Sequence, residues 1–73
     1  MSTIRKGFGL TVRRKRERLG LSQEKLAELA DIHRTYMSSI ELGKVTVGID
    51  VASKVAKALK TPLSKLLHEA EKT

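Results

Sequence analysis

The chain has 73 residues, which is enough for one domain with a small hydrophobic core. The absence of cysteine excludes a disulfide scaffold and a thiolate zinc site, and it fits a cytoplasmic protein. Fifteen basic residues against eight acidic ones give a formal net charge of +7, which favours a polyanionic partner over a merely solvated basic surface.

Neither a membrane span nor a secretory signal is expected, because no apolar run is long enough for either. The charge is unevenly distributed along the chain. Residues 1–20 contain seven basic side chains and one acidic one, whereas residues 21–44 contain three basic and four acidic ones. Whatever the middle of the chain contacts is therefore not held there mainly by net charge.

The apolar spacing predicts helices throughout, since no alternating strand pattern or hairpin signal occurs. The first helix is expected over about residues 4–19, with Phe8, Val12 and Leu19 on its buried face. Arg16 falls on the same face, and a buried guanidinium needs a carboxylate partner.

Glycines and a serine set the next boundaries. Gly7 and Gly9 are expected to weaken the first turn of this helix, and Gly20 to end it in the left-handed conformation. Ser22 is a predicted N-cap for a second helix over residues 23–30. Its inward stripe should consist of Leu26, Ala27, Leu29 and Ala30.

A third helix is predicted within "HRTYMSSIE", followed by a stop at Gly43. At 100° per residue its inward side contains Met37, Ile40 and Glu41, with Tyr36 at the edge. The outward side contains Thr35, Ser38, Ser39 and Leu42, with Arg34 at the N-terminal end. One face is therefore core, and the other consists of hydrogen-bonding groups with short reach.

Two more helices are expected in the last third. The fourth, about residues 49–59, places Ala52, Val55, Ala56 and Leu59 inward. Thr61 and Pro62 resemble the cap and first residue of a fifth helix. Its apolar stripe of Leu63, Leu66 and Leu67 is core or a dimer seam. The single domain of residues 1–73 should have its core within about 8–68 and a frayed tail over 69–73.

Two short helices joined by about three residues form a helix-turn-helix. The second helix fits the major groove of duplex DNA, where base edges present donors and acceptors in a sequence-dependent pattern. Arginine can bond guanine, and serine and threonine hydroxyls can donate or accept. The outward side of the third helix therefore suits base reading.

The stretches "LGLSQEKLAELADIHRTYMSSIELGK" and "IDVASKVAKALKTPLSKLL" resemble the Xre-type helix-turn-helix, the phage-repressor family, over about Val12–Leu67. The shared features are Leu-Gly-Leu-Ser-Gln, a Leu-Ala pair, Ile-Glu-x-Gly and Ala-x-Ala-Leu. "HRTYMSSIE" is also similar to the controller proteins of restriction–modification systems. The resemblance implies an all-α, five-helix, lambda-repressor-like fold, with the second and third helices as the helix-turn-helix.

The resemblance also implies roles for individual residues. It implies that Arg34, Thr35, Ser38 and Ser39 contact base edges. It also implies that Gln23, Tyr36 and Lys44 contact DNA phosphates. We add Arg14 as a further candidate phosphate contact because it lies on the basic first helix. Arg16 and Glu41 match a largely buried salt bridge. The chain departs from the family at four positions. Asp31 and Lys60 stand where the family often has glycine. Leu42 stands where a polar or basic residue is common, and Gly48 where serine or threonine often caps the fourth helix.

The expected function is sequence-specific binding of duplex DNA by a homodimeric transcriptional regulator on a palindromic operator. No catalytic cluster, cofactor, metal site or small-molecule ligand is expected. Open alternatives are an antitoxin-type interaction module, a prophage regulator instead of a restriction–modification controller, and contact of acidic Glu24, Glu28 and Asp31 with RNA polymerase. Arg34 as a solvated side chain and Tyr36 as a cover of the core edge also remain open.

Overall fold

The computed structural model describes residues 3–72, which form five helices and no strand. The expected all-α fold is confirmed. In chain order the helices are α1 (Thr3–Arg18), α2 (Gln23–Leu29), α3 (Arg34–Glu41), α4 (Ile49–Ala58) and α5 (Leu63–Lys72).

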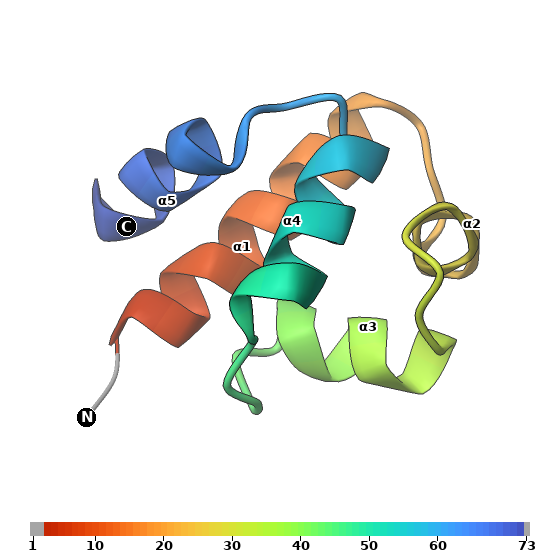
Figure 1. Cartoon of the computed structure of the whole chain (residues 1–73), viewed down its shortest axis with the longest axis horizontal. Helices are drawn as coiled ribbons and strands as arrows, with labels where there is room; N and C mark the ends of the chain where they lie inside the picture. Colours follow the sequence, from red (N-terminus) through yellow and green to blue (C-terminus); the bar gives the residue numbers. More distant parts are fainter. Residues whose placement is uncertain (1–2, 73) are drawn as a thin grey trace.

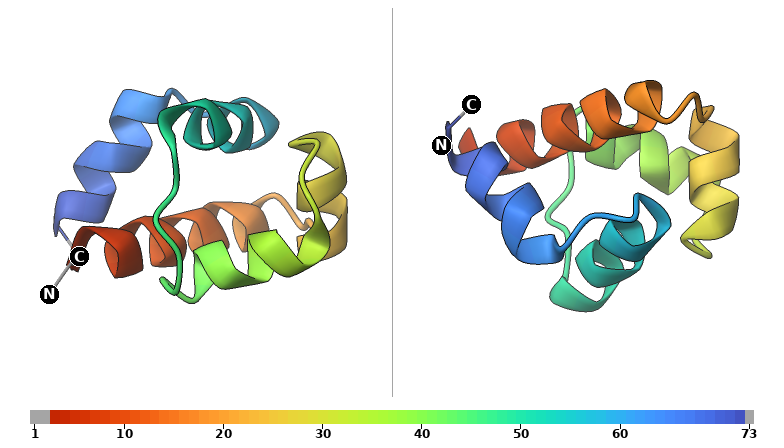
Figure 2. Two further views of the ribbon diagram at one scale, coloured as in Figure 1. Left: turned by 60° about the horizontal axis from the view of Figure 1, so that its bottom comes forward. Right: turned by 90° about the horizontal axis from the view of Figure 1, so that it is seen from above.

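Helix α1 is the longest helix and lies at the centre of the arrangement (Figure 1). It packs against α5 on one side and against α3 on another, and α2 and α3 pack together near its C-terminal end. Helix α4 contacts both α2 and α5, so it closes the bundle over the core. The two further views show α3 lying alongside α1, with α4 on the other side of the molecule from α3 (Figure 2).

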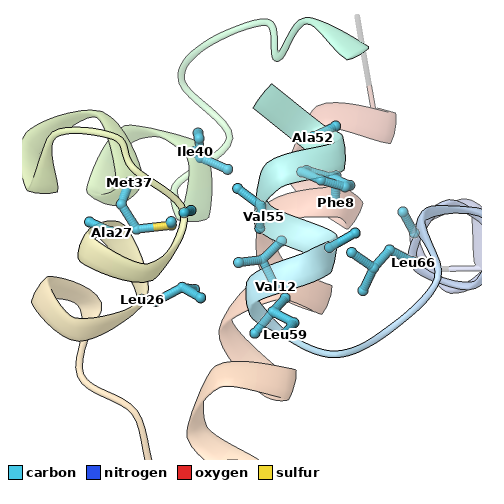
Figure 3. Packing of buried hydrophobic residues seen from close by; sticks show 13 residues of the cluster. Phe8, Val12, Leu26, Ala27, Met37, Ile40, Ala52, Val55, Leu59 and Leu66 are labelled. Atoms are coloured by element: carbon cyan, nitrogen blue, oxygen red, sulfur yellow. The ribbon is translucent and has the colours of Figure 1, made fainter. Parts of the chain in front are cut away.

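The core is aliphatic apart from Phe8 and lies where all five helices converge (Figure 3). Val12, Leu26, Met37, Val55 and Leu66 are fully shielded from solvent. Each of the five helices contributes one of these residues. Further buried residues follow or precede them by three or four positions, as Ile40 follows Met37 and Leu59 follows Val55, which reflects the amphipathic pattern of the sequence. The inward positions expected for α3 and α4 are confirmed.

Four helices end in the same hydrogen-bonded motif. In each, the residue in the left-handed conformation is followed by an amide that reaches back five residues, as from Leu21 to the carbonyl of Arg16. The left-handed residues are Gly20, Asp31, Gly43 and Lys60, with φ of 73°, 57°, 71° and 55°. In the left-handed conformation a side chain beyond Cα costs steric energy that glycine avoids. The ends of α2 and α4, at Asp31 and Lys60, are therefore strained.

Two expected core positions are wrong. Leu19 is 47% exposed and Leu29 is 51% exposed. Helix α1 ends at Arg18, so Leu19 lies beyond its last full turn, and Leu29 is the last residue of α2. Periodicity alone extends an apolar stripe past the point where the helix turns away from its neighbours.

The expected fraying of residues 69–73 is also wrong for 69–72, while Thr73 lies outside the described residues. Helix α5 continues to Lys72, and Ala70 is buried in the core. Lys15 pairs with Glu69 at 3.1 Å, and this hydrogen bond lowers the pKa of Glu69. Thr61 does not cap α5, because its hydroxyl donates to the carbonyl of Leu59 and the helix begins at Leu63.

Gly7 and Gly9 are contact points as well as weak helix formers. A Cβ on Gly7 would overlap the carbonyl oxygen of Ala70 in α5, and one on Gly9 would overlap the carbonyl of Ile40 in α3. Both helices therefore approach the backbone of α1 at positions that only glycine permits. Among the described residues, no helix is long and apolar enough to cross a membrane.

Candidate nucleic-acid interface

Helices α2 and α3 form a helix-turn-helix whose N-terminal ends are each capped by a side chain. The Ser22 hydroxyl accepts from the amide of Lys25 at 3.0 Å, which confirms the predicted cap of α2. At the start of α3, Nδ1 of His33 accepts from the amide of Thr35 at 3.1 Å. The first turns of both helices are thereby held in a defined geometry.

A buried ion pair fastens this unit to α1. Nε of Arg16 donates to one Glu41 oxygen at 2.7 Å, and Nη2 donates to the other at 3.1 Å. The side chains are 12% and 2% exposed, respectively. Arg16 also donates from Nη1 to the carbonyl of Leu21 at 2.8 Å. One guanidinium therefore joins the end of α3 to the segment that leads into α2.

Gln23 completes the network. Its amide nitrogen donates to Glu41 Oε1 at 3.0 Å, so the Glu41 carboxylate binds α1 and α2 at once. The hydrogen bond with Glu41 raises the pKa of Arg16, against the opposing effect of burial. The guanidinium therefore stays charged in the fold.

The outer face of α3 is open to solvent. Arg34 and Thr35 are exposed, and Ser38 and Ser39 are half-buried, so none of the four candidate base-reading side chains is packed inside the fold. A hollow of about 460 Å³ separates the starts of α2 and α3. It is lined by Ser22, Gln23, Glu24, Arg34, Thr35 and Ser38. The structure thus brings Gln23 together with three of the four candidate readers.

The remaining candidate phosphate contacts lie in different surroundings. Lys44 is exposed immediately beyond the end of α3. Tyr36 is half-buried and packs against the core, so its ring covers the core edge. Arg14 lies away from α3 and lines a hollow between α1 and α5 with Glu69 and Lys72. The structure therefore does not bring Arg14 to the proposed interface.

The apolar stripe of α5, predicted to be core or a dimer seam, is mostly core within its own chain. Leu66 is fully buried within its own chain and is unavailable to a partner, and Leu63 is half-buried against the core. Leu67 is 39% exposed and lines an apolar hollow of about 410 Å³ with Ile4, Phe8, Val47 and Ala52. Ile49, at the start of α4, is 76% exposed.

Sequence reasoning missed two features of the interface. His33 as a cap of α3 had no signal in its residue type, because oxygen side chains are the common caps. The bond from Gln23 to Glu41 joins residues far apart in the sequence, and no local pattern reveals it. Within residues 3–72, no group of three potential ligands could hold a metal ion.

The fold and the open polar face of α3 define the class: a helix-turn-helix DNA-binding regulator of transcription. The sequence pattern of the helix-turn-helix family matches residues 12–66, which span all five helices in whole or in part. The chain therefore belongs to the helix-turn-helix family.

Several control proteins are similar to it. Control protein C.BamHI of Bacillus amyloliquefaciens is 45% identical over 90% of this chain and 83% of its own length. Control protein C.MunI of Mycoplasma sp is 38% identical over 99% of both chains. The crystal structure of the restriction-modification controller protein C.AhdI from Aeromonas hydrophila superposes with a TM-score of 0.82, at 36% identity, over 84% of this chain and 92% of that one.

Removing the Glu41 carboxylate should destabilise the fold strongly. The variant Glu41→Ala leaves the Arg16 guanidinium poorly solvated and unpaired, so we expect a loss of roughly 3–5 kcal/mol in the free energy of unfolding. The control Glu17→Ala breaks the exposed pair with Arg13 and should cost less than about 1 kcal/mol. Urea denaturation followed by circular dichroism measures both; equal, small losses would contradict the fastening role of the pair.

Proposed function

We propose that this protein is a sequence-specific regulator that inserts α3 into the major groove, with Arg34, Thr35, Ser38 and Ser39 facing base edges. The observation that carries the proposal is the open polar side of α3 beside the start of α2. The side chains there have short reach, and Arg34 has the fork that matches the two acceptors of guanine.

The phosphate contacts come from the ends of the helix-turn-helix. The Gln23 amide has two hydrogens, and its bond to Glu41 leaves the other available for a phosphate oxygen. The free amides of the first turn of α2 add donors of the same kind. Lys44 lies just past α3 and provides a positive charge at the opposite end. Such contacts set the register of the protein on the duplex.

We further propose a homodimer on a palindromic operator. One short helix reads too few bases for a unique site, whereas two copies read half-sites about 34–36 Å apart. The surface for the partner is the apolar hollow around Leu67 together with the exposed Ile49. The proposed dimer interface therefore still involves the last two helices, but Leu67 and Ile49 take the place of Leu63 and Leu66 in it.

The similarity to C.BamHI, C.MunI and C.AhdI supports a controller of a restriction–modification system over a prophage regulator. An antitoxin-type role would need a free tail to bind a partner. Helix α5 instead continues to Lys72, and Ala70 packs in the core, so residues 63–72 belong to the fold. Contact with RNA polymerase through Glu24, Glu28 and Asp31 is compatible with their exposure, although Lys25 pairs with Glu28.

Three single substitutions test the interface. Arg34→Ala should weaken binding to the preferred duplex by about 1–3 kcal/mol while leaving a scrambled duplex nearly unaffected. Lys44→Ala should weaken both duplexes alike and reduce the slope of log affinity against log salt by about one. Arg14→Ala removes the same charge from another face and should change neither property. Fluorescence anisotropy over a salt series measures all three, and equal losses on both duplexes for Arg34→Ala would refute base reading.

The dimer is tested by adding charge to its proposed seam. Ile49→Glu should convert the protein to a monomer at concentrations where the unsubstituted chain is dimeric, because a carboxylate would be buried against apolar side chains. Leu29→Glu changes another exposed leucine and should leave the dimer intact. Sedimentation equilibrium gives both results, and a monomeric unsubstituted chain or equal sensitivity at Leu29 would contradict this interface.

A further inference from the structure

The side-chain cap of α3 differs chemically from that of α2. Ser22 caps α2 with a hydroxyl oxygen, whereas His33 caps α3 with a ring nitrogen. His33 has the extended backbone usual for a cap, with φ −70° and ψ 143°. Its Nδ1 accepts the amide hydrogen of Thr35, the second residue of the helix. The first turn of the helix proposed to read bases is therefore held by an imidazole.

This hydrogen bond requires the neutral ring. Nδ1 can accept only through its lone pair, so the single ring proton must be on Nε2. A second proton would convert Nδ1 into a donor that faces the amide donor of Thr35. It would also place a positive charge at the positive end of the helix dipole. Imidazole changes charge between about pH 5 and 8, so the cap can be lost within an ordinary pH range.

The residues that depend on this cap are those at the start of α3. Arg34 and Thr35 directly follow His33, and both are exposed at the hollow shared with α2. We propose that His33 is a positioning residue: its neutral ring orders the turn from which Arg34 and Thr35 project, and its protonation lowers sequence-specific affinity. The inference rests on the proposed function, because it assigns a control point within the same surface.

Charged groups of both signs lie on the elements around the cap. His33 follows the turn after α2 and starts α3; α3 packs on α2, which in turn contacts α4. The charged side chains of these elements are Asp31 in the turn, Glu24, Lys25 and Glu28 in α2, Arg34 and Glu41 in α3, and Asp50, Lys54 and Lys57 in α4. Lys25 and Glu28 already pair with each other at 3.0 Å. Arg34 directly follows His33 in the chain, and Asp31 precedes it by two residues.

The test compares the unsubstituted protein with His33→Asn and His68→Asn between pH 7.5 and 5.5 at constant ionic strength. Asparagine is a strong N-cap that does not titrate in this range. His68 lies exposed on α5 and serves as the matched histidine control. The two readouts are the NMR signal of the Thr35 amide in the free protein and the affinity for preferred and scrambled duplexes.

We expect the Thr35 amide signal to follow the titration of the His33 ring in the unsubstituted protein and in His68→Asn. Specific affinity of these two proteins should fall about five-fold more on acidification than that of His33→Asn, the size of a lost cap. His33→Asn should match the unsubstituted protein at pH 7.5.

Opposite results separate the failure of this inference from the failure of the proposed function. A Thr35 amide that ignores the His33 titration overturns the cap. Affinity that rises on acidification only when His33 is present assigns its charged ring to a phosphate instead and overturns the positioning role. If no variant prefers one duplex over another at either pH, the proposed function is wrong, and the positioning role is wrong with it.

Discussion

The ion pair between Arg16 and Glu41 is the constraint on which the rest of the structure depends. Glu41 ends α3, Arg16 lies in α1, and the same guanidinium holds the carbonyl of Leu21 while Gln23 bonds the same carboxylate. The helix-turn-helix is thereby fixed to the longest helix at both of its ends. With its inner side committed to this network and to the core, α3 can present only its polar side outward. The proposed reading of base edges follows from that orientation.

Much of the fold could be predicted from the sequence because it is encoded locally. The apolar spacing identified Phe8 and Val12 as core, and glycine at position 43 marked the end of α3. The odd position of Arg16 on an apolar face already demanded a carboxylate partner. The polar outer side of α3 is likewise a property of its own periodicity, which is why its exposure could be anticipated.

The remaining features depend on contacts between distant segments. Position 7 must be glycine because the carbonyl oxygen of Ala70 lies against it. Neither local sequence predicts that α5 packs so closely on α1 at this point. The same packing turns the expected loose tail into the last turns of α5. Leu66 and Leu67 are adjacent in sequence and equally apolar, yet one is fully buried and the other is 39% exposed. Only the position of α5 on α1 decides which of them a partner could reach.

The most direct test of the account is selection of bound duplexes from a random pool at a stated, near-physiological salt concentration. If the outer side of α3 reads base edges from a two-fold dimer, the selected duplexes should share two inverted half-sites whose centres lie about one helical turn apart. Enrichment of no common sequence, with all duplexes bound equally, would contradict the central claim, because contacts to phosphates alone carry no base preference.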